Sequence, residues 1–180
     1  MNLLSIFQQR HSIRKYTGAP IDDAALTQII QAGLLSASSR SIRPWEFIVV
    51  KDKDMLRHLS ECRTGAARML AGADAGIVVI ANAEASDVWI EDCSIAMANM
   101  HLMADSLGVG SCWIQGRLRT ATTADSGTAS VTTEDYVREC LDFPEGYKLE
   151  AILSLGMPAE EKTPAELSKL PFEKIHYEKF

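Results

Sequence analysis

The feature that most constrains the fold is a long helical segment, residues 87–107, that is apolar on nearly every face. Gly108 ends it, and its apolar residues are Val88, Trp89, Ile90, Ile95, Met97, Met100, Leu102, Met103 and Leu107. A helix of this kind must be covered on most of its sides. In a chain of 180 residues, a dimer interface is one way to cover the second face. We read its methionines as core or interface packing.

Shorter elements surround this helix. Helical spacing and capping residues predict helices at residues 2–9, 23–36, 53–62 and 133–141. Short β-branched runs predict strands at residues 46–50, 76–81, 109–114 and 148–155. This order predicts an α+β fold in which helices cover a sheet. No glycine-rich dinucleotide fingerprint and no P-loop occurs, which disfavours a doubly wound sheet.

Composition and length indicate one domain over residues 1–180, with 47% hydrophobic and 23% charged residues. No apolar run approaches the ~20 residues of a membrane span, and the first residues lack a signal peptide, so we expect a cytoplasmic protein without a membrane partner. The net charge of −6 argues against nucleic acid as a partner. The four cysteines form no C-x-x-C pair, and therefore predict neither a metal site nor a redox disulfide.

A basic cluster near the N-terminus is the first candidate binding site. Arg10, Ser12 and Arg14 alternate along residues 10–16, which we expect to be a strand or an extended arm, so their side chains share one face. Two guanidinium groups and a hydroxyl on one face suit a phosphate. The alternative is a surface strand of alternating charge.

Two further segments are candidates. Residues 36–41 form a serine-rich loop that can direct hydroxyl and amide groups at a polyol, although serine also favours ordinary turns. Residues 108–116 place glycines around a strand, and Gly116 would let the backbone approach a flat ring. The alternative is that these glycines only end a helix and permit a turn. Residues 120–132 are small and polar, and predict a flexible loop.

Taken together, these segments resemble the nitroreductase-like family of FMN-dependent oxidoreductases. The resemblance is carried by RHSIRKY at 10–16, SASS at 36–39, Pro-Trp with its strand at 44–50, LGVGSCWIQG at 107–116 and EGYKLEAILSLGMPAEE at 145–161. It implies a mostly antiparallel sheet covered by helices and an intertwined homodimer with FMN in each interface cleft.

The resemblance also implies roles for particular residues. Arg10, His11, Ser12 and Arg14 match the positions that hold the FMN phosphate and nearby flavin atoms. The loop from the other subunit is matched by Ala37, Ser38 and Ser39. The segment against the isoalloxazine, where a backbone amide can face N5, is matched by Ile114, Gln115 and Gly116. Two basic residues, near flavin N1 and O2 and near the phosphate, are matched by Arg68 and Lys169.

The implied activity is hydride transfer from NADH or NADPH through FMN to an electron-poor small molecule such as a nitroaromatic or a quinone. This chemistry belongs to the cofactor and requires no catalytic side chain or metal. The alternatives are a flavin-fragmenting or reductively dehalogenating relative, or a non-enzymatic anion-binding dimer. We expect His58, His101 and His176 to be structural or solvated, and Glu91 and Asp92 to face solvent or cap the long helix.

Overall fold

The computed structural model describes residues 2–121 and 130–180, and within them one antiparallel sheet forms the centre. Its strands are β1 (Trp45–Val50), β2 (Ala75–Asn82), β3 (Gly110–Gln115) and β4 (Tyr147–Gly156). They lie in the order β1-β2-β4-β3, and every neighbouring pair is antiparallel. This order places β3, which carries the third candidate segment, at an edge of the sheet.

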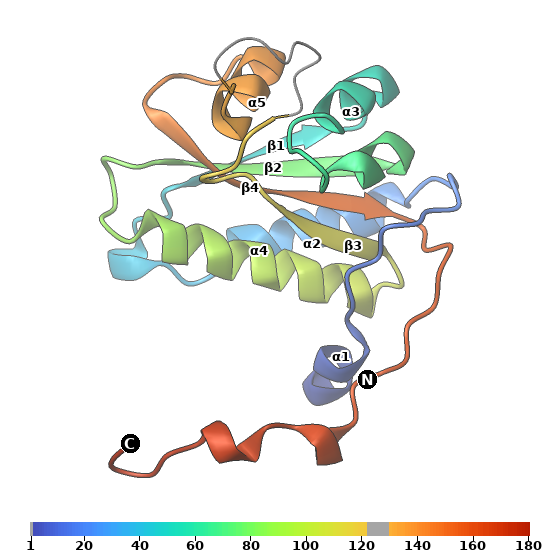
Figure 1. Ribbon diagram of the computed structural model, residues 1–180, viewed down its shortest axis with the longest axis vertical. Helices are drawn as coiled ribbons and strands as arrows, with labels where there is room; N and C mark the ends of the chain where they lie inside the picture. The colour runs from blue at the N-terminus through green and yellow to red at the C-terminus, as the bar shows by residue number, and fades with distance from the viewer. Residues whose placement is uncertain (1, 122–129) are drawn as a thin grey trace.

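Helices cover both faces of the sheet (Figure 1). One face is covered by α2 (Asp23–Leu34) and α4 (Trp89–Ser106), and the other by α3 (Lys53–Leu59) and α5 (Thr133–Leu141). The helix starts follow capping chemistry, because Asp22, Asp52 and Thr132 each accept a backbone N–H from the first turn. A short helix, α1 (Leu3–Gln9), and the C-terminal segment extend away from these layers (Figure 1).

The strands supply side chains to two apolar cores. On β2, Ile77 and Val79 face α2 and α4, whereas Val78 and Ile80 face α3 and α5. All four are buried, which matches the continuous β-branched run that predicted a central strand. Burial of each such side chain contributes about 1.5–3 kcal/mol, so the two cores together hold the layers.

The long helix α4 is only partly covered by its own chain. Met97 and Met100 are fully buried against α2 and the sheet. Ile95 remains 42% exposed, and Leu102 and Met103 are half-buried at a cavity that α1 also lines. The expectation that one protomer leaves part of this helix uncovered therefore agrees with the structure.

The arm after α1 is fixed to the start of β3 and the end of β4. Ser12 forms a parallel bridge with Ser111, and the Ile13 amide donates to Ser111 O at 2.9 Å. The Tyr16 hydroxyl bonds Ser154 Oγ at 2.8 Å and donates to Ile13 O at 2.9 Å. Burial raises the pKa of Tyr16, so this hydroxyl keeps its proton and the arm stays anchored.

Glycines make this docking possible. A Cβ on Gly110 would lie 2.8 Å from Ile13 Cγ2, and a Cβ on Gly156 would lie 2.6 Å from the Tyr16 ring. Only glycine lets the arm approach both strands so closely.

The α+β class, the helices and all four predicted strands are confirmed, and their bounds shift by one or a few residues. The helices predicted at residues 23–36 and 53–62 end earlier, at Leu34 and Leu59. Within the loop predicted at 120–132, residues 122–129 lie outside the described residues. Across the parts of the chain that the structure describes, no helix combines the length and apolarity needed to cross a membrane.

Gly156→Ala tests the docking of the arm. The added methyl group meets the Tyr16 ring, so we expect the free energy of unfolding to fall by about 1–3 kcal/mol in urea titrations. Gly146→Ala is the matched control, because a Cβ there meets nothing within 4 Å, and it should change stability by less than ~0.5 kcal/mol. Equal effects of the two variants would contradict the close approach.

Candidate functional site

The arm brings three of the predicted phosphate-binding residues to the edge of the sheet. Because Ser12 is bridged to Ser111, the neighbouring Arg10 and Arg14 are held beside the start of β3. Arg10 is half-buried, and Arg14 is exposed with Nη1 donating to Ser12 O at 3.4 Å. Among the ion pairs of the described residues, none involves Arg10, His11 or Arg14. In a chain of net charge −6, the guanidinium groups of Arg10 and Arg14 thus have no carboxylate ion-pair partner among the described residues.

Two more polar groups belong to this region, Glu160 beside the arm and His11 within it. Glu160 accepts the backbone N–H of Arg14 at 2.7 Å and pairs through its other oxygen with Lys162. Both contacts, with Lys162 as the larger cause, lower the pKa of Glu160 to about 2, so it is ionised at neutral pH. His11 carries a buried Nε2 that has no hydrogen-bond partner within the described chain. A buried polar atom without a partner is typical of a site that a ligand completes.

His101 of α4 contacts the Arg10 side chain. Arg10 Nη1 lies 2.9 Å from His101 Nε2, and His101 Nδ1 bonds Ser111 Oγ on β3. Burial, and next the Arg10 charge, lower the pKa of His101 from 6.5 to about 4. Because the folded pKa is depressed, its contribution to stability is fully present above about pH 6.5 and is lost as the pH falls toward about 4.

A cavity of about 330 Å³ opens at this cluster. It is lined by Phe7, Arg10, Ser12, Ala98, His101, Leu102 and Trp113. Its lining combines one guanidinium group and one hydroxyl with apolar side chains, which suits an amphipathic ligand with an anionic end.

At its far end, β3 carries the residues predicted to face a flat ring. Trp113 Nε1 donates to Gln115 Oε1 at 2.9 Å, and Gln115 Nε2 donates to the Glu150 backbone oxygen at 3.2 Å. Ile114 is buried in the core with α3 and α5. Burial raises the pKa of Glu150, whose Oε2 has no partner within the described residues. Trp113, Gln115 and Glu150 therefore hold this end of the edge strand in one arrangement.

Gly116 has a packing reason in addition to the predicted one. A Cβ at position 116 would lie 2.5 Å from Leu149 Cδ2, so close packing against β4 requires a glycine at this position. The amides of Gly116 and Arg117 both donate to Glu150 O, at 3.1 and 3.0 Å. A cavity of about 490 Å³ begins here, lined by residues 116–120 and Trp89.

The serine loop is fixed at the other end of α4. Ser38 Oγ accepts the Arg43 amide at 2.9 Å, and the Ser39 amide donates to Asp92 Oδ1 at 2.8 Å. The next residues have left-handed backbone, with φ of 52°, 55° and 52° at Arg40, Ser41 and Arg43, which is costly for non-glycine residues. Asp92 and His101 are nine positions apart, or about 13 Å along a helix. Ser36, where the loop begins, accepts the Asn99 side-chain amide at 2.8 Å, whereas Ser39 and the arm contact different parts of α4.

The structure does not bring Arg68 or Lys169 to the arm. Arg68 begins a short 3₁₀ helix on the face covered by α3 and α5, and its side chain is exposed. Lys169 lies on the exposed C-terminal segment, where it pairs with Glu166 at 2.7 Å. Ala37 of the serine loop is exposed as well.

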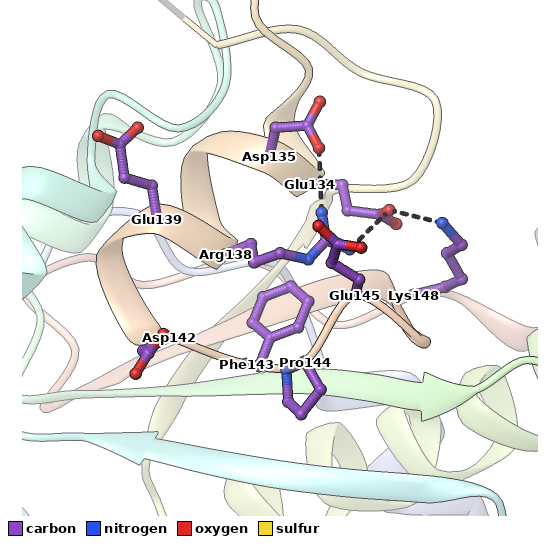
Figure 2. Close-up of a pocket in the computed structure, with 9 residues that line it drawn as sticks. All are labelled: Glu134, Asp135, Arg138, Glu139, Asp142, Phe143, Pro144, Glu145 and Lys148. Carbon is purple, nitrogen blue, oxygen red and sulfur yellow. Dashed lines mark hydrogen bonds and ion pairs between the residues drawn. The ribbon is translucent and has the colours of Figure 1, made fainter.

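A larger cavity, of about 960 Å³, lies beside α5 and is chemically unlike the arm (Figure 2). Figure 2 shows Arg138 between Glu134 and Asp135. Its ion pairs with them measure 2.9 and 3.0 Å, and its guanidinium lies 4.8 Å from the centroid of the Phe143 ring. Lys148 pairs with Glu134. Carboxylates outnumber the cations in its lining, and the cations already have partners, so it does not suit a phosphate.

One polar residue of α4, Asp92, was assigned the wrong surroundings from sequence, and another, His101, has partners that the sequence did not indicate. Asp92 neither faces solvent nor caps the helix, because it is 3% exposed and binds the Ser39 amide and Ser86 Oγ. His101 is structural, which is one of the two roles expected for it, and its partners are Arg10 and Ser111. The sequence did offer an indication that partners exist. Both residues fall within a helix that is otherwise apolar on nearly all faces, and a polar side chain buried there needs a hydrogen-bond partner.

Fold and site together define an antiparallel α+β sheet with a basic arm, carrying Arg10 and Arg14, at its edge strand. The family model described as Nitroreductase family matches residues 7–62 and 55–157, which is most of the chain. The chain belongs to the nitroreductase family.

Individual relatives agree with this assignment. A protein of Archaeoglobus fulgidus with the provisional name NADH dehydrogenase/NAD(P)H nitroreductase is 35% identical over 98% of both chains. An FMN-dependent nitroreductase from Clostridium difficile is 43% identical, with a TM-score of 0.91 over 98% of this chain and 99% of that one. A structure from Parabacteroides distasonis, also provisionally named an NADH dehydrogenase/NAD(P)H nitroreductase, is 31% identical with a TM-score of 0.86 over the whole of both chains.

Proposed function

We propose that this protein is an FMN-dependent oxidoreductase that transfers hydride from NADH or NADPH to an electron-poor small molecule. The observation that carries the proposal is the arm, where Arg10, Ser12 and Arg14 gather without a carboxylate ion-pair partner in the described chain. Membership of the nitroreductase family, and 43% identity to a protein named an FMN-dependent nitroreductase, support the identity of the ligand.

The residues of the arm fit the phosphate end of FMN. Guanidinium groups donate in a planar fork that matches phosphate oxygens, and a serine hydroxyl adds a neutral donor. His11 Nε2, which is buried without a partner, supplies a further polar atom for the ligand. The arm is held by Ser111, Ser154 and two glycines, so these donors are positioned before the ligand binds.

The ring fits along the open edge of β3. In this arrangement the flavin extends from the arm toward Ile114, Gln115 and Gly116. Ala37, Ser38 and Ser39 come from a second protomer, because Ser39 of one chain is held at Asp92, about 13 Å along α4 from the residue His101 that contacts the arm. Arg68 and Lys169 remain proposed contacts to the ring edge and to the phosphate, with Lys169 delivered to a partner by the C-terminal segment.

Bound FMN supplies the redox chemistry by accepting hydride from NADH or NADPH and passing it to an acceptor such as a nitroaromatic or a quinone. The chain binds and orients the cofactor and shields the site from water. No side chain is required as a nucleophile, which agrees with the packing and hydrogen-bonding roles of Trp113 and Gln115.

The same account requires a homodimer. Apolar side chains on α1 and the C-terminal segment are exposed in one protomer: Leu3, Leu4, Phe7, Leu167, Leu170, Phe172, Ile175 and Tyr177. The cavity beside α4 adds about 270 Å³ of apolar groove, lined by Leu3, Ile6, Leu35 and Met103 among others. A set of exposed apolar side chains next to an apolar groove marks an interaction site, and a second copy of the chain would cover it.

The dimer can be tested by analytical ultracentrifugation. We expect a mass of twice 19.8 kDa at micromolar concentration. Replacing Leu170 and Phe172 together by serine removes apolar contact area and should raise the dimer dissociation constant at least ~10-fold. Lys174→Ser, in the same segment, is the control and should leave the dimer intact. A wild-type protein that stays monomeric would contradict the proposal.

The flavin site can be tested by fluorescence titration of the apoprotein with FMN. Replacing Arg10 and Arg14 together by alanine removes charge-assisted bonds worth about 1.5–3 kcal/mol each, so FMN affinity should fall at least ~100-fold. Urea unfolding should show that the fold survives. Arg57 is an exposed arginine of α3, on the face of the sheet that α3 and α5 cover, so the Arg57→Ala variant should bind FMN like the wild type. Unchanged affinity in the double variant would remove the phosphate assignment.

Anaerobic addition of NADH or NADPH separates the reaction classes. The proposal predicts that the absorption band of bound oxidised FMN is lost on reduction and returns when a quinone or nitroaromatic is added. Retention of FMN without reduction would indicate a flavin-fragmenting or dehalogenating relative. A colourless protein that does not take up FMN would indicate an anion-binding dimer.

A further inference from the structure

His101 is a buried histidine that contacts the predicted phosphate ligand Arg10 and is itself held by a strand. It is 6% exposed, it lies between Arg10 and Ser111, and it lines the cavity at the arm. We propose that His101, neutral and protonated on Nδ1, is a positioning residue that fixes the Arg10 guanidinium for the phosphate of the cofactor. The inference rests on the proposed function and assigns that site a residue outside the arm.

The hydrogen-bond partners determine the tautomer. An arginine side chain can only donate, so the 2.9 Å contact from Arg10 Nη1 requires a lone pair on His101 Nε2. The proton of the neutral ring must then be on Nδ1, where it donates to Ser111 Oγ. Ser111 is fixed in β3 and bridged to Ser12, so the chain from Ser111 through His101 to Arg10 is anchored to the strand that holds the arm.

This arrangement orients an otherwise flexible cation. Arginine has a long side chain that loses rotamer freedom when it binds a ligand, and a side chain held beforehand loses less. Within the described residues Arg10 uses one N–H on His101, which leaves its other donors for a phosphate. An aspartate or glutamate at position 101 would hold Arg10 as well, but it would also neutralise the charge that the anion needs. A neutral acceptor orients the guanidinium and leaves its charge in place.

The charged surroundings favour the neutral ring. Arg10 is the charged group that directly faces His101, and together with burial it lowers the pKa of His101. Asp105, farther along α4, interacts with Arg10 and His11, and Cys112 on β3 is near Arg10 and Arg14. Burial raises the pKa of both Asp105 and Cys112, so the Cys112 thiol, whose ordinary pKa already lies above neutral, adds no negative charge near the ring at pH 7. Protonation of His101 would remove the acceptor on Nε2 and place a second cation against Arg10.

Three substitutions separate positioning from packing. His101→Gln places an amide oxygen near the position of Nε2 and keeps an acceptor for Arg10. His101→Asn places its amide near Nδ1, so it keeps a polar group for Ser111 but cannot reach Arg10. His101→Leu retains volume without hydrogen bonding. A residue that only fills the core would not distinguish glutamine from asparagine in this way.

FMN titration of the three apoproteins is the first test. We expect His101→Gln to bind within ~3-fold of the wild type, and His101→Asn and His101→Leu to bind about 10-fold or more weakly, the usual loss for one hydrogen bond to a charged group. Urea unfolding should give similar stabilities for the glutamine and asparagine variants.

The pH dependence of FMN affinity gives a separate readout. As the pH falls from 6.5 toward 4, the ratio of wild-type to glutamine-variant affinity should decline, because only the wild type loses its acceptor. The phosphate of FMN titrates in the same way in both experiments, so its effect on affinity cancels in this ratio.

Nitrogen NMR of the histidine ring in the apoprotein is the second test and needs no cofactor. The proposal predicts a neutral ring at pH 7 with its proton on Nδ1. A proton on Nε2, or equal FMN affinities of the glutamine and asparagine variants, would overturn the role of His101 while the flavin site stands. A wild-type protein that shows the predicted tautomer but binds no FMN would overturn the proposed function, and with it the role of His101 toward a flavin.

Discussion

The short pairing between the N-terminal arm and the first residues of β3 is the contact on which the rest of the site depends. Ser12 and Ser111 form the bridge, and the Tyr16 hydroxyl holds the arm to β4 through its hydrogen bond with Ser154. Without this contact, Arg10 and Arg14 would be ordinary surface arginines on a flexible segment. With it, they become fixed donors at the edge of a sheet. The two glycines under Ile13 and Tyr16 are therefore as much part of the site as the arginines.

The sheet order supplies the second requirement. Because β3 pairs only with β4 among the described strands, its other side is open beyond the arm. A ligand anchored at the arm can follow that edge toward Gln115 and Gly116. The other candidate residues lie at distant points of one protomer, on the serine loop and the C-terminal segment. Exposed apolar surface on α1 and that segment gives a physical reason for a second copy that would complete the site.

Much of this architecture was predictable from sequence because it depends on local patterns. The apolar helix, the β-branched strands and the alternation of Arg10, Ser12 and Arg14 all have regular spacing, and the structure confirms the elements. Partnerships between distant residues were not predictable. The bonds from Asp92 to Ser39 and from His101 to Arg10 join segments 53 and 91 positions apart, and nothing local specifies them. The packing of Gly116 against Leu149 likewise depends on how β3 and β4 are paired.

The central claim is that the arm recognises the phosphate of a flavin mononucleotide. Its most direct test compares the affinities of the wild-type apoprotein for FMN and for riboflavin, which has the same ring and polyol but no phosphate. The account predicts that FMN binds at least ~100-fold more tightly, since charge-assisted bonds from two arginines depend on the phosphate. Equal affinities for the two flavins would contradict it.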